Sequence, residues 1–168
     1  SLLSLLNIKY VKSNAGRIPE LVQDHIDSES YQKSQEYTVT KERFGLVQAL
    51  FSAIFLLFLI LGGFLGSLDE RISELGLGSS IHGVVYVFVI TLIFSVVSIP
   101  FQVYSTFFIE ERFGFNKMTW KLFILDQVKG LILSAVLMTP LLFGLFWFMD
   151  TTGEWWWIYA FVFIMSFQ

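Results

Sequence analysis

Three long stretches of the chain are almost free of charged side chains. Residues 44–68 and 81–109 contain no Asp, Glu, Lys or Arg, and residues 122–149 contain only one Asp and one Lys, both near the start. A helix needs about 20 predominantly apolar residues to cross a bilayer whose hydrocarbon core is about 30 Å thick. The pattern therefore predicts three complete membrane helices over these ranges. We expect Pro100 to kink the second of them.

The two ends of the chain are also apolar but are too short to cross a membrane. Residues 1–8 read SLLSLLNI, and residues 155–168 read WWWIYAFVFIMSFQ. We expect the first to be the end of one membrane helix and the second to be the start of a further helix. The chain is therefore interpreted as a fragment of a longer protein.

Residues 9–43 form a polar connection between the first two membrane helices. Pro19 suits a first helical position, and the apolar residues that follow helical spacing are Ile18, Leu21, Val22 and Ile26. This spacing predicts a short amphipathic helix. Residues 28–44, SESYQKSQEYTVTKERF, are expected to continue as a polar helix, with Thr38 or Thr40 able to cap the entry into the first complete span. The fold class predicted is all-α, a polytopic membrane helix bundle with a cytoplasmic amphipathic segment. That segment is either a solvated connector on the membrane surface or a wall of a cytoplasm-facing site.

Composition and charge support a membrane protein. Hydrophobic residues make up 55% of the chain and charged residues 15%, and the mean hydropathy is +0.66. Soluble domains carry far more charge. The net charge of −3 indicates neither nucleic-acid binding nor an acidic tail, and the lack of Cys excludes disulfides and thiolate chemistry within these residues.

The basic residues predict the orientation. Ten of the eleven Lys and Arg fall in residues 9–43 or in and just after residues 110–121, which an alternating topology places on one side of the membrane. The positive-inside rule assigns that side to the cytoplasm. The three tryptophans of residues 155–157 are then expected at the outer interface, where indole rings prefer to lie.

Most single features that invite chemistry do not support a site. His25 and His82 are the only histidines, they are predicted on opposite sides of the membrane, and neither begins an H-E-x-x-H motif. Gly62 and Gly66 form a G-x-x-x-G pair, which we interpret as a place where another helix packs closely. Metal-binding and cofactor-binding residues are therefore predicted to be absent from this chain.

Asp126 and Lys129 allow two interpretations. Three residues apart on a helix, they share a face and can pair, and ionisable groups at membrane depth usually face a bundle interior or a wet cavity. Alternatively, both lie at the interface and Lys129 extends to cytoplasmic water. The sequence leaves both open.

The most specific stretch is YSTFFIEERFGFNKMTWK, residues 104–121, which forms a dense polar junction between two predicted helices. Gly114 marks a turn, and Thr119 is a predicted N-cap. We expect the charged and polar residues to cluster at a cytoplasmic mouth, with their charges paired because unpaired charges would be costly there. Together with the two ionisable residues of the following helix, these candidate residues are Glu110, Glu111, Arg112, Asn116, Lys117, Asp126 and Lys129.

This junction resembles that of the integral-membrane CAAX prenyl protease family, zinc metallopeptidases of the a-factor-converting type. The family's pattern is I-E-E-x-x-G-F-N-K-x-T followed by a helix with an early Asp. The matching residues are Ile109, Glu110, Glu111, Gly114, Phe115, Asn116, Lys117, Thr119 and Asp126. In the preceding segment, the matching residues are Pro19, Glu36, Tyr37, Thr38, Lys41 and Phe44. The resemblance therefore covers nearly the whole chain, at the N-terminal membrane portion of the family.

The resemblance implies a seven-helix protein that encloses a large water-filled chamber, with a zinc site built by a downstream H-E-x-x-H helix and a later glutamate. Two imidazoles and a carboxylate would bind the zinc, and the glutamate of the motif would act as base on the metal-bound water. None of these residues is in this chain, so we expect it to hold no catalytic residue and no zinc, and to be inactive without the downstream metallopeptidase portion.

The implied partners are membrane lipid, the metallopeptidase portion and a peptide or protein substrate, which would be a prenylated CAAX peptide in eukaryotes or another membrane protein in bacteria. A bacterial inner membrane is favoured over the endoplasmic reticulum. A fragment of a transporter and a structural membrane subunit without a catalytic site are the alternative functions, although neither explains the polar junction.

Overall fold

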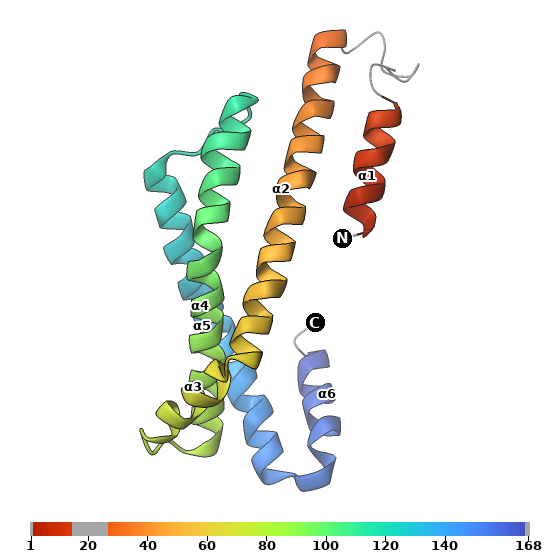
Figure 1. Ribbon diagram of the computed structural model, residues 1–168. Helices are drawn as coiled ribbons and strands as arrows, with labels where there is room; N and C mark the ends of the chain where they lie inside the picture. Colours follow the sequence, from red (N-terminus) through yellow and green to blue (C-terminus); the bar gives the residue numbers. More distant parts are fainter. Residues whose placement is uncertain (1, 15–26, 167–168) are drawn as a thin grey trace. The chain divides into compact units, whose positions relative to one another are not determined.

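The computed structural model describes residues 2–14 and 27–166, and within these ranges all regular structure is helical. Figure 1 shows the elements in chain order. The helices are α1 (Leu2–Ser13), α2 (Ser28–Leu61), α3 (Phe64–Ser73), α4 (Ser79–Tyr104), the π-helix η2 (Ser105–Glu110), α5 (Trp120–Thr151), the short 3₁₀ helix η3 (Gly153–Trp155) and α6 (Trp156–Ser166). The predicted all-α class is confirmed.

Three helical stretches are long and apolar enough to cross a membrane: Ser28–Leu61, Ser79–Glu110 and Trp120–Thr151. Almost none of their side chains is buried, and large apolar residues such as Leu61 and Val136 are 82% and 63% exposed. Such a surface would aggregate in water but is the surface that a helix presents to lipid or to further helices. The three predicted spans therefore correspond to these three stretches.

The first long helix includes the polar residues 28–44 that were expected to be helical. It starts at Ser28, where the carboxylate of Asp27 accepts a hydrogen bond from the backbone N–H of Ser30. A hydrogen bond from the Ser30 hydroxyl, together with this backbone contact, lowers the pKa of Asp27. The expected caps Thr38 and Thr40 both lie inside α2, because residues 28–43 contain no Gly or Pro that would interrupt a helix.

The same helix ends earlier than predicted. Residues 44–68 were expected to form one helix, but α2 ends at Leu61, and Gly63 adopts the left-handed region with φ of 71°. A residue with a side chain rarely adopts this conformation, so the two adjacent glycines break the helix before α3 starts at Phe64. The G-x-x-x-G pair Gly62 and Gly66 therefore does not share one helix, and a Cβ atom added to Gly66 would meet no atom of another helix within 4 Å.

The remaining boundaries follow the predictions more closely. Residues 81–109 fall within α4 and η2, and residues 122–149 fall within α5. The described parts of the two apolar ends, 2–8 and 155–166, fall within α1 and within η3 and α6. Pro100 lies inside α4, and the kink expected there stays a prediction. The predicted amphipathic helix around Pro19 lies outside the described residues.

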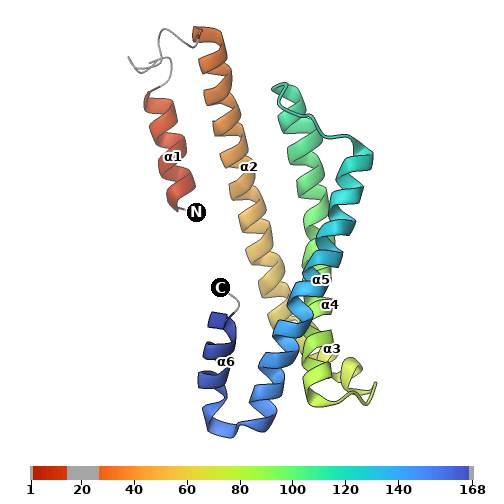
Figure 2. The same cartoon turned by 180° about the vertical axis from the view of Figure 1, so that it is seen from behind.

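The chain forms two compact units, which are described separately. The first contains α1, most of α2 and residues 98–118. Here α1 lies antiparallel to α2 (Figures 1 and 2), since Asn7 donates a hydrogen bond to Glu42 and Gln35 donates one to the carbonyl of Asn14. Phe101 packs against both Phe44 and Phe51, with ring centroids 6.1 and 4.9 Å apart, which holds the end of α4 against α2.

The second unit contains α3, the first part of α4, α5 and α6. Its helices approach closely at two glycines that the sequence did not single out for packing. A Cβ atom added to Gly83 of α4 would lie 2.7 Å from the ring of Phe146 in α5, and one added to Gly144 would lie 2.9 Å from the ring of Phe163 in α6. Each glycine therefore provides the space that an aromatic ring of the neighbouring helix occupies.

Polar contacts hold the ends of the helices in this second unit. Ser79 and Ser80 at the start of α4 donate hydrogen bonds of 3.0 and 2.8 Å to the carboxylate of Asp150 at the end of α5. His82 lies 2.7 Å from the carboxylate of Asp69 in α3. His82 therefore connects the start of α4 to α3.

Candidate functional site

The candidate site lies in the first unit, where the polar junction follows α4. The last turns before the junction form a π-helix, Ser105–Glu110, which has more residues per turn than an α-helix and so rotates the residues that follow it. The carbonyl of Glu110 then accepts hydrogen bonds from the N–H groups of Phe115 at 2.9 Å and Asn116 at 3.2 Å. Gly114 has φ of 70°, which permits this tight reversal of the chain.

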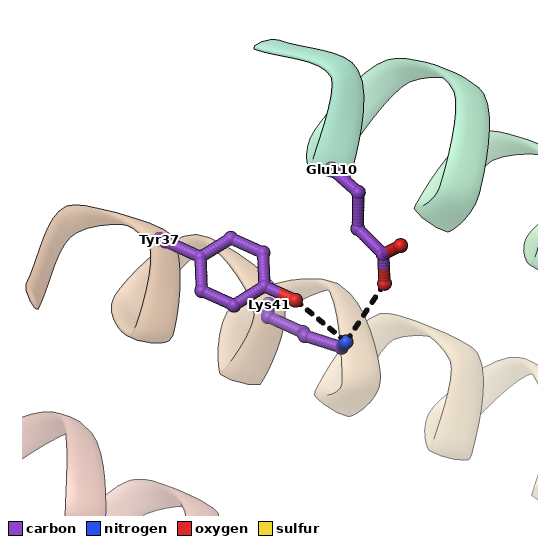
Figure 3. A network of polar contacts seen from close by, with 3 residues as sticks. All are labelled: Tyr37, Lys41 and Glu110. Carbon is purple, nitrogen blue, oxygen red and sulfur yellow. Dashed lines mark hydrogen bonds and ion pairs between the residues drawn. The ribbon is translucent and has the colours of Figure 1, made fainter. Parts of the chain in front are cut away.

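An ion pair joins the junction to α2. The ammonium group of Lys41 donates hydrogen bonds to Oε1 of Glu110 at 3.0 Å and to the hydroxyl oxygen of Tyr37 at 2.7 Å (Figure 3). The side chains of Lys41 and Glu110 are 48% and 26% exposed, so solvent screens the pair and its net contribution to stability is about 1 kcal/mol or less. The pair therefore specifies how the two segments meet more than it stabilises the fold.

Aromatic packing carries more of the contact between these two segments. The ring of Tyr37 meets the rings of Phe113 and Phe115 edge-on, with centroids 5.6 and 4.9 Å apart. Phe113 is only 6% exposed and Ile109 only 4%. These apolar contacts position the carboxylate of Glu110 in front of Lys41.

The junction residues predicted to cluster are divided among separate contacts. Glu110 pairs with Lys41, while Glu111 accepts a hydrogen bond of 2.9 Å from the amide of Asn116. The guanidinium of Arg112 lies 5.8 Å from the ring centroid of Phe113, and Lys117 is exposed. These junction residues therefore do not form a single paired network, because the turn directs consecutive side chains to different sides.

Asp126 and Lys129 lie in α5, which belongs to the second unit, and both are exposed. Within the described ranges, the ion pairs are Lys41 with Glu110 and His82 with Asp69, so these two residues do not pair with each other. The two interpretations open in the sequence, a bundle interior or wet cavity and the membrane interface, both stay predictions. The proposed role of the two residues at a chamber mouth also stays a prediction.

Tyr37 and Lys41 are the contact residues that the sequence analysis did not select as site residues. Both had been noted as matching the family's pattern in the segment before the first span, and that match was the available signal. Lys41 lies 69 residues before Glu110 in the sequence, so no local sequence pattern could predict this contact.

Asn116 uses both ends of its side-chain amide, which explains why an amide is required. Its NH₂ donates to Glu111, and its oxygen accepts a hydrogen bond of 2.7 Å from the N–H of Met118. We expect Asn116→Asp to lower the thermal stability by about 1 kcal/mol, because it removes a donor and places two carboxylates side by side. Adding Glu111→Gln restores a donor and should recover most of the loss. Equal stability of the single and double variants in a thermal-unfolding assay would contradict this arrangement.

A zinc site of the implied kind does not fit the residues present. In the part of the chain that the structure describes, no three side chains among His, Asp and Glu converge to hold a metal ion. His82 lies within hydrogen-bond distance of Asp69, and the sequence contains no H-E-x-x-H motif. We therefore derive no catalytic step through zinc from these residues.

Comparison with known proteins matches both the sequence and the fold. Residues 7–168 match a family model described as CAAX prenyl protease N-terminal, five membrane helices. A probable CAAX prenyl protease 1 of Schizosaccharomyces pombe is 35% identical over 72% of this chain and 28% of its own length. A CAAX prenyl protease 1 homolog of Arabidopsis thaliana is 32% identical over 89% of this chain and 37% of its own length.

The fold is likewise similar to a solved structure. A crystal structure of Ste24p from S. mikatae matches 98% of this chain and 40% of its own chain, with a TM-score of 0.81 and 24% identity. The predicted polytopic membrane fold is thereby confirmed, and the chain is part of an integral membrane protein. It spans about a third of the length of the relatives that it matches.

Proposed function

The chain belongs to the CAAX prenyl protease N-terminal family, and from this premise we propose that it forms the membrane-embedded wall of a zinc metalloendopeptidase chamber. In this proposal the zinc-binding H-E-x-x-H helix and the later glutamate lie downstream of Gln168. The chain alone then binds no catalytic zinc and cleaves no peptide. Its contribution is to shape the chamber and to form part of its entrance.

The observation that carries this proposal is the junction after η2. Its residues match the family's pattern, and the structure explains their chemistry: Gly114 allows the reversal, Asn116 holds it closed, and Glu110 meets Lys41 of α2. A transporter fragment or a structural subunit would need helix packing but would not need these residue types at this turn. We therefore interpret the junction as a rigid rim of the chamber entrance.

The side of the membrane and the substrate are further parts of the proposal. We place residues 9–43 and 110–121 in the cytoplasm, since the positive-inside rule applies equally to the bacterial inner membrane favoured by the sequence and to the endoplasmic reticulum. Labelling of single introduced cysteines from either side would test this, because the chain has no Cys of its own. The substrate would be a C-terminal prenylated CAAX peptide in a eukaryote, or another membrane protein in a bacterium.

The decisive experiment compares three purified proteins: residues 1–168, the full-length protein, and the full-length protein with the glutamate of H-E-x-x-H changed to Gln. We expect about one zinc per molecule in both full-length proteins and none in residues 1–168. Cleavage of a prenylated CAAX peptide or of an unfolded membrane protein is expected only for the unaltered full-length protein. Stoichiometric zinc in residues 1–168, or a coding sequence without H-E-x-x-H, would contradict the proposal.

A further inference from the structure

A groove of about 360 Å³ lies within the first unit, between α1, α2 and the junction. Its apolar floor is formed by Val11 of α1, Val39 of α2 and Phe113 of the junction, and two cationic side chains, Lys12 and Arg112, line it from opposite elements. The volume is in the range of pockets that bind small molecules.

The two cations that line the groove are not paired with any carboxylate of the described residues. In the described part of the chain, neither Lys12 nor Arg112 forms an ion pair, and both are exposed. Glu36 also lines the groove and is not within ion-pair distance of either, so two positive charges and one negative charge leave a net lining charge of +1. Gln32 and Thr40 add neutral hydrogen-bonding groups. This combination suits an anion with polar neighbours, because a guanidinium binds phosphate oxygens in bidentate fashion and an ammonium adds a point charge.

One end of the groove lies just beyond the apolar stretches, and the groove extends outward along α2 to Gln32, about 18 Å from Phe44 along the helix. Thr40 lies four residues before the charge-free stretch that begins at Phe44, which is about 6 Å along a helix at about 1.5 Å per residue. In α1, Lys12 lies four residues after Ile8, the last residue of the apolar start of the chain. Arg112 lies three residues after Ile109, the last residue of the second charge-free stretch. The headgroup layer of one leaflet is about 5–8 Å thick, so this end of the groove lies at the depth of lipid phosphates.

From these observations we propose that the groove binds the headgroup of an anionic phospholipid, with the phosphate between Lys12 and Arg112. The apolar floor contacts the carbon atoms of the headgroup and the first acyl carbons. The lipid thus bridges α1, α2 and the junction at the entrance. Basic pockets beside membrane helices on the cytoplasmic side are known sites for acidic headgroups. This inference does not depend on protease activity, and its test uses no cleavage assay.

The test is native mass spectrometry of the delipidated full-length protein titrated with phosphatidylglycerol or phosphatidylcholine. We expect one tight phosphatidylglycerol adduct that phosphatidylcholine does not form at the same concentration. The double variant Lys12→Gln, Arg112→Gln should weaken this adduct about tenfold or more. The charge-preserving variant Lys12→Arg, Arg112→Lys should retain most of the affinity for phosphatidylglycerol. Retained binding by this variant would show that the Gln variant binds more weakly because the charges are lost, and not because substitution at these two positions unfolds the groove.

A matched control removes two cations that do not line the groove, Lys9→Gln with Lys121→Gln, and should leave the adduct within about twofold. Equal weakening by the control and by the groove variant would overturn the proposal, because it would indicate diffuse attraction between basic residues and acidic lipid. Equal binding of the two lipids would also overturn it. So would binding of inorganic phosphate or glycerol phosphate as tight as that of the lipid, since the ligand would then be a soluble anion.

Discussion

Replacing Gly83 with Leu is expected to lower the stability of the chain by about 2 kcal/mol, measured as thermal unfolding in detergent by tryptophan fluorescence. The reason is steric: a Cβ atom at this position would lie 2.7–2.9 Å from three ring carbons of Phe146, closer than nonbonded carbon atoms approach. A larger side chain in an interface packed this closely forces helices or rotamers to shift, and overpacking of this kind costs about 1–3 kcal/mol. Contact between α4 and α5 in the second unit should therefore loosen.

Two further variants distinguish this explanation from a general intolerance of Leu. Gly130→Leu in α5 is the matched control, because a Cβ atom at Gly130 would meet no other atom within 4 Å, and it should be neutral or slightly stabilising through helix propensity. Adding Phe146→Ala to Gly83→Leu should recover part of the loss, since it removes the ring that clashes. If Gly83→Leu unfolded at the same temperature as Gly130→Leu, the proposed packing would be wrong.

Replacing Tyr37 with Ala is expected to cost about 2 kcal/mol and to release the junction. The substitution removes two edge-on aromatic contacts, with Phe113 and Phe115, each worth about 0.5–1.5 kcal/mol beyond the area buried. It also removes the hydroxyl that accepts a hydrogen bond from Lys41. Hydrogen exchange of the amides of residues 113–116, which donate backbone hydrogen bonds across the turn, should accelerate together with the loss of stability.

Tyr37→Phe separates the two contributions. It keeps the ring and loses only the exposed hydrogen bond to Lys41, so it should cost less than about 1 kcal/mol and leave the exchange of residues 113–116 nearly unchanged. A loss equal to that of Tyr37→Ala would mean that the hydrogen bond, and not the aromatic packing, holds the junction. Both variants leave Glu110 in place, so the exchange data report on the position of the turn itself.

Helix boundaries show where local patterns were sufficient and where they were not. The predicted 122–149 and observed Trp120–Thr151 nearly coincide, because Thr119 accepts a hydrogen bond from the N–H of Leu122 and so marks the start of α5 in the sequence itself. The polar residues 28–44 were expected to be helical, and α2 does start at Ser28. Its end was predicted too late, because apolar residues continue to Leu68 while Gly63 breaks the helix after Leu61.

Glycine roles could not be assigned from spacing. Gly62 and Gly66 have the spacing of a packing motif, yet Gly63 between them turns the chain, and the close helix contacts occur at Gly83 and Gly144. Whether a glycine breaks a helix or admits a neighbour depends on what lies opposite it. In this chain the neighbours are Phe146 and Phe163, and neither is local in sequence to the glycine's own turn.

The sequence by itself determined that this is a helical membrane protein of the CAAX prenyl protease family, because span length, hydropathy and the residues of the junction are properties of short, continuous segments. Only the tertiary structure decided what those segments contact: that Glu110 meets Lys41, that the ring of Tyr37 packs against Phe113 and Phe115, and that Lys12 and Arg112 line one groove. The physical reason is that such contacts depend on how helices far apart in the chain are rotated and aligned, which no local pattern records.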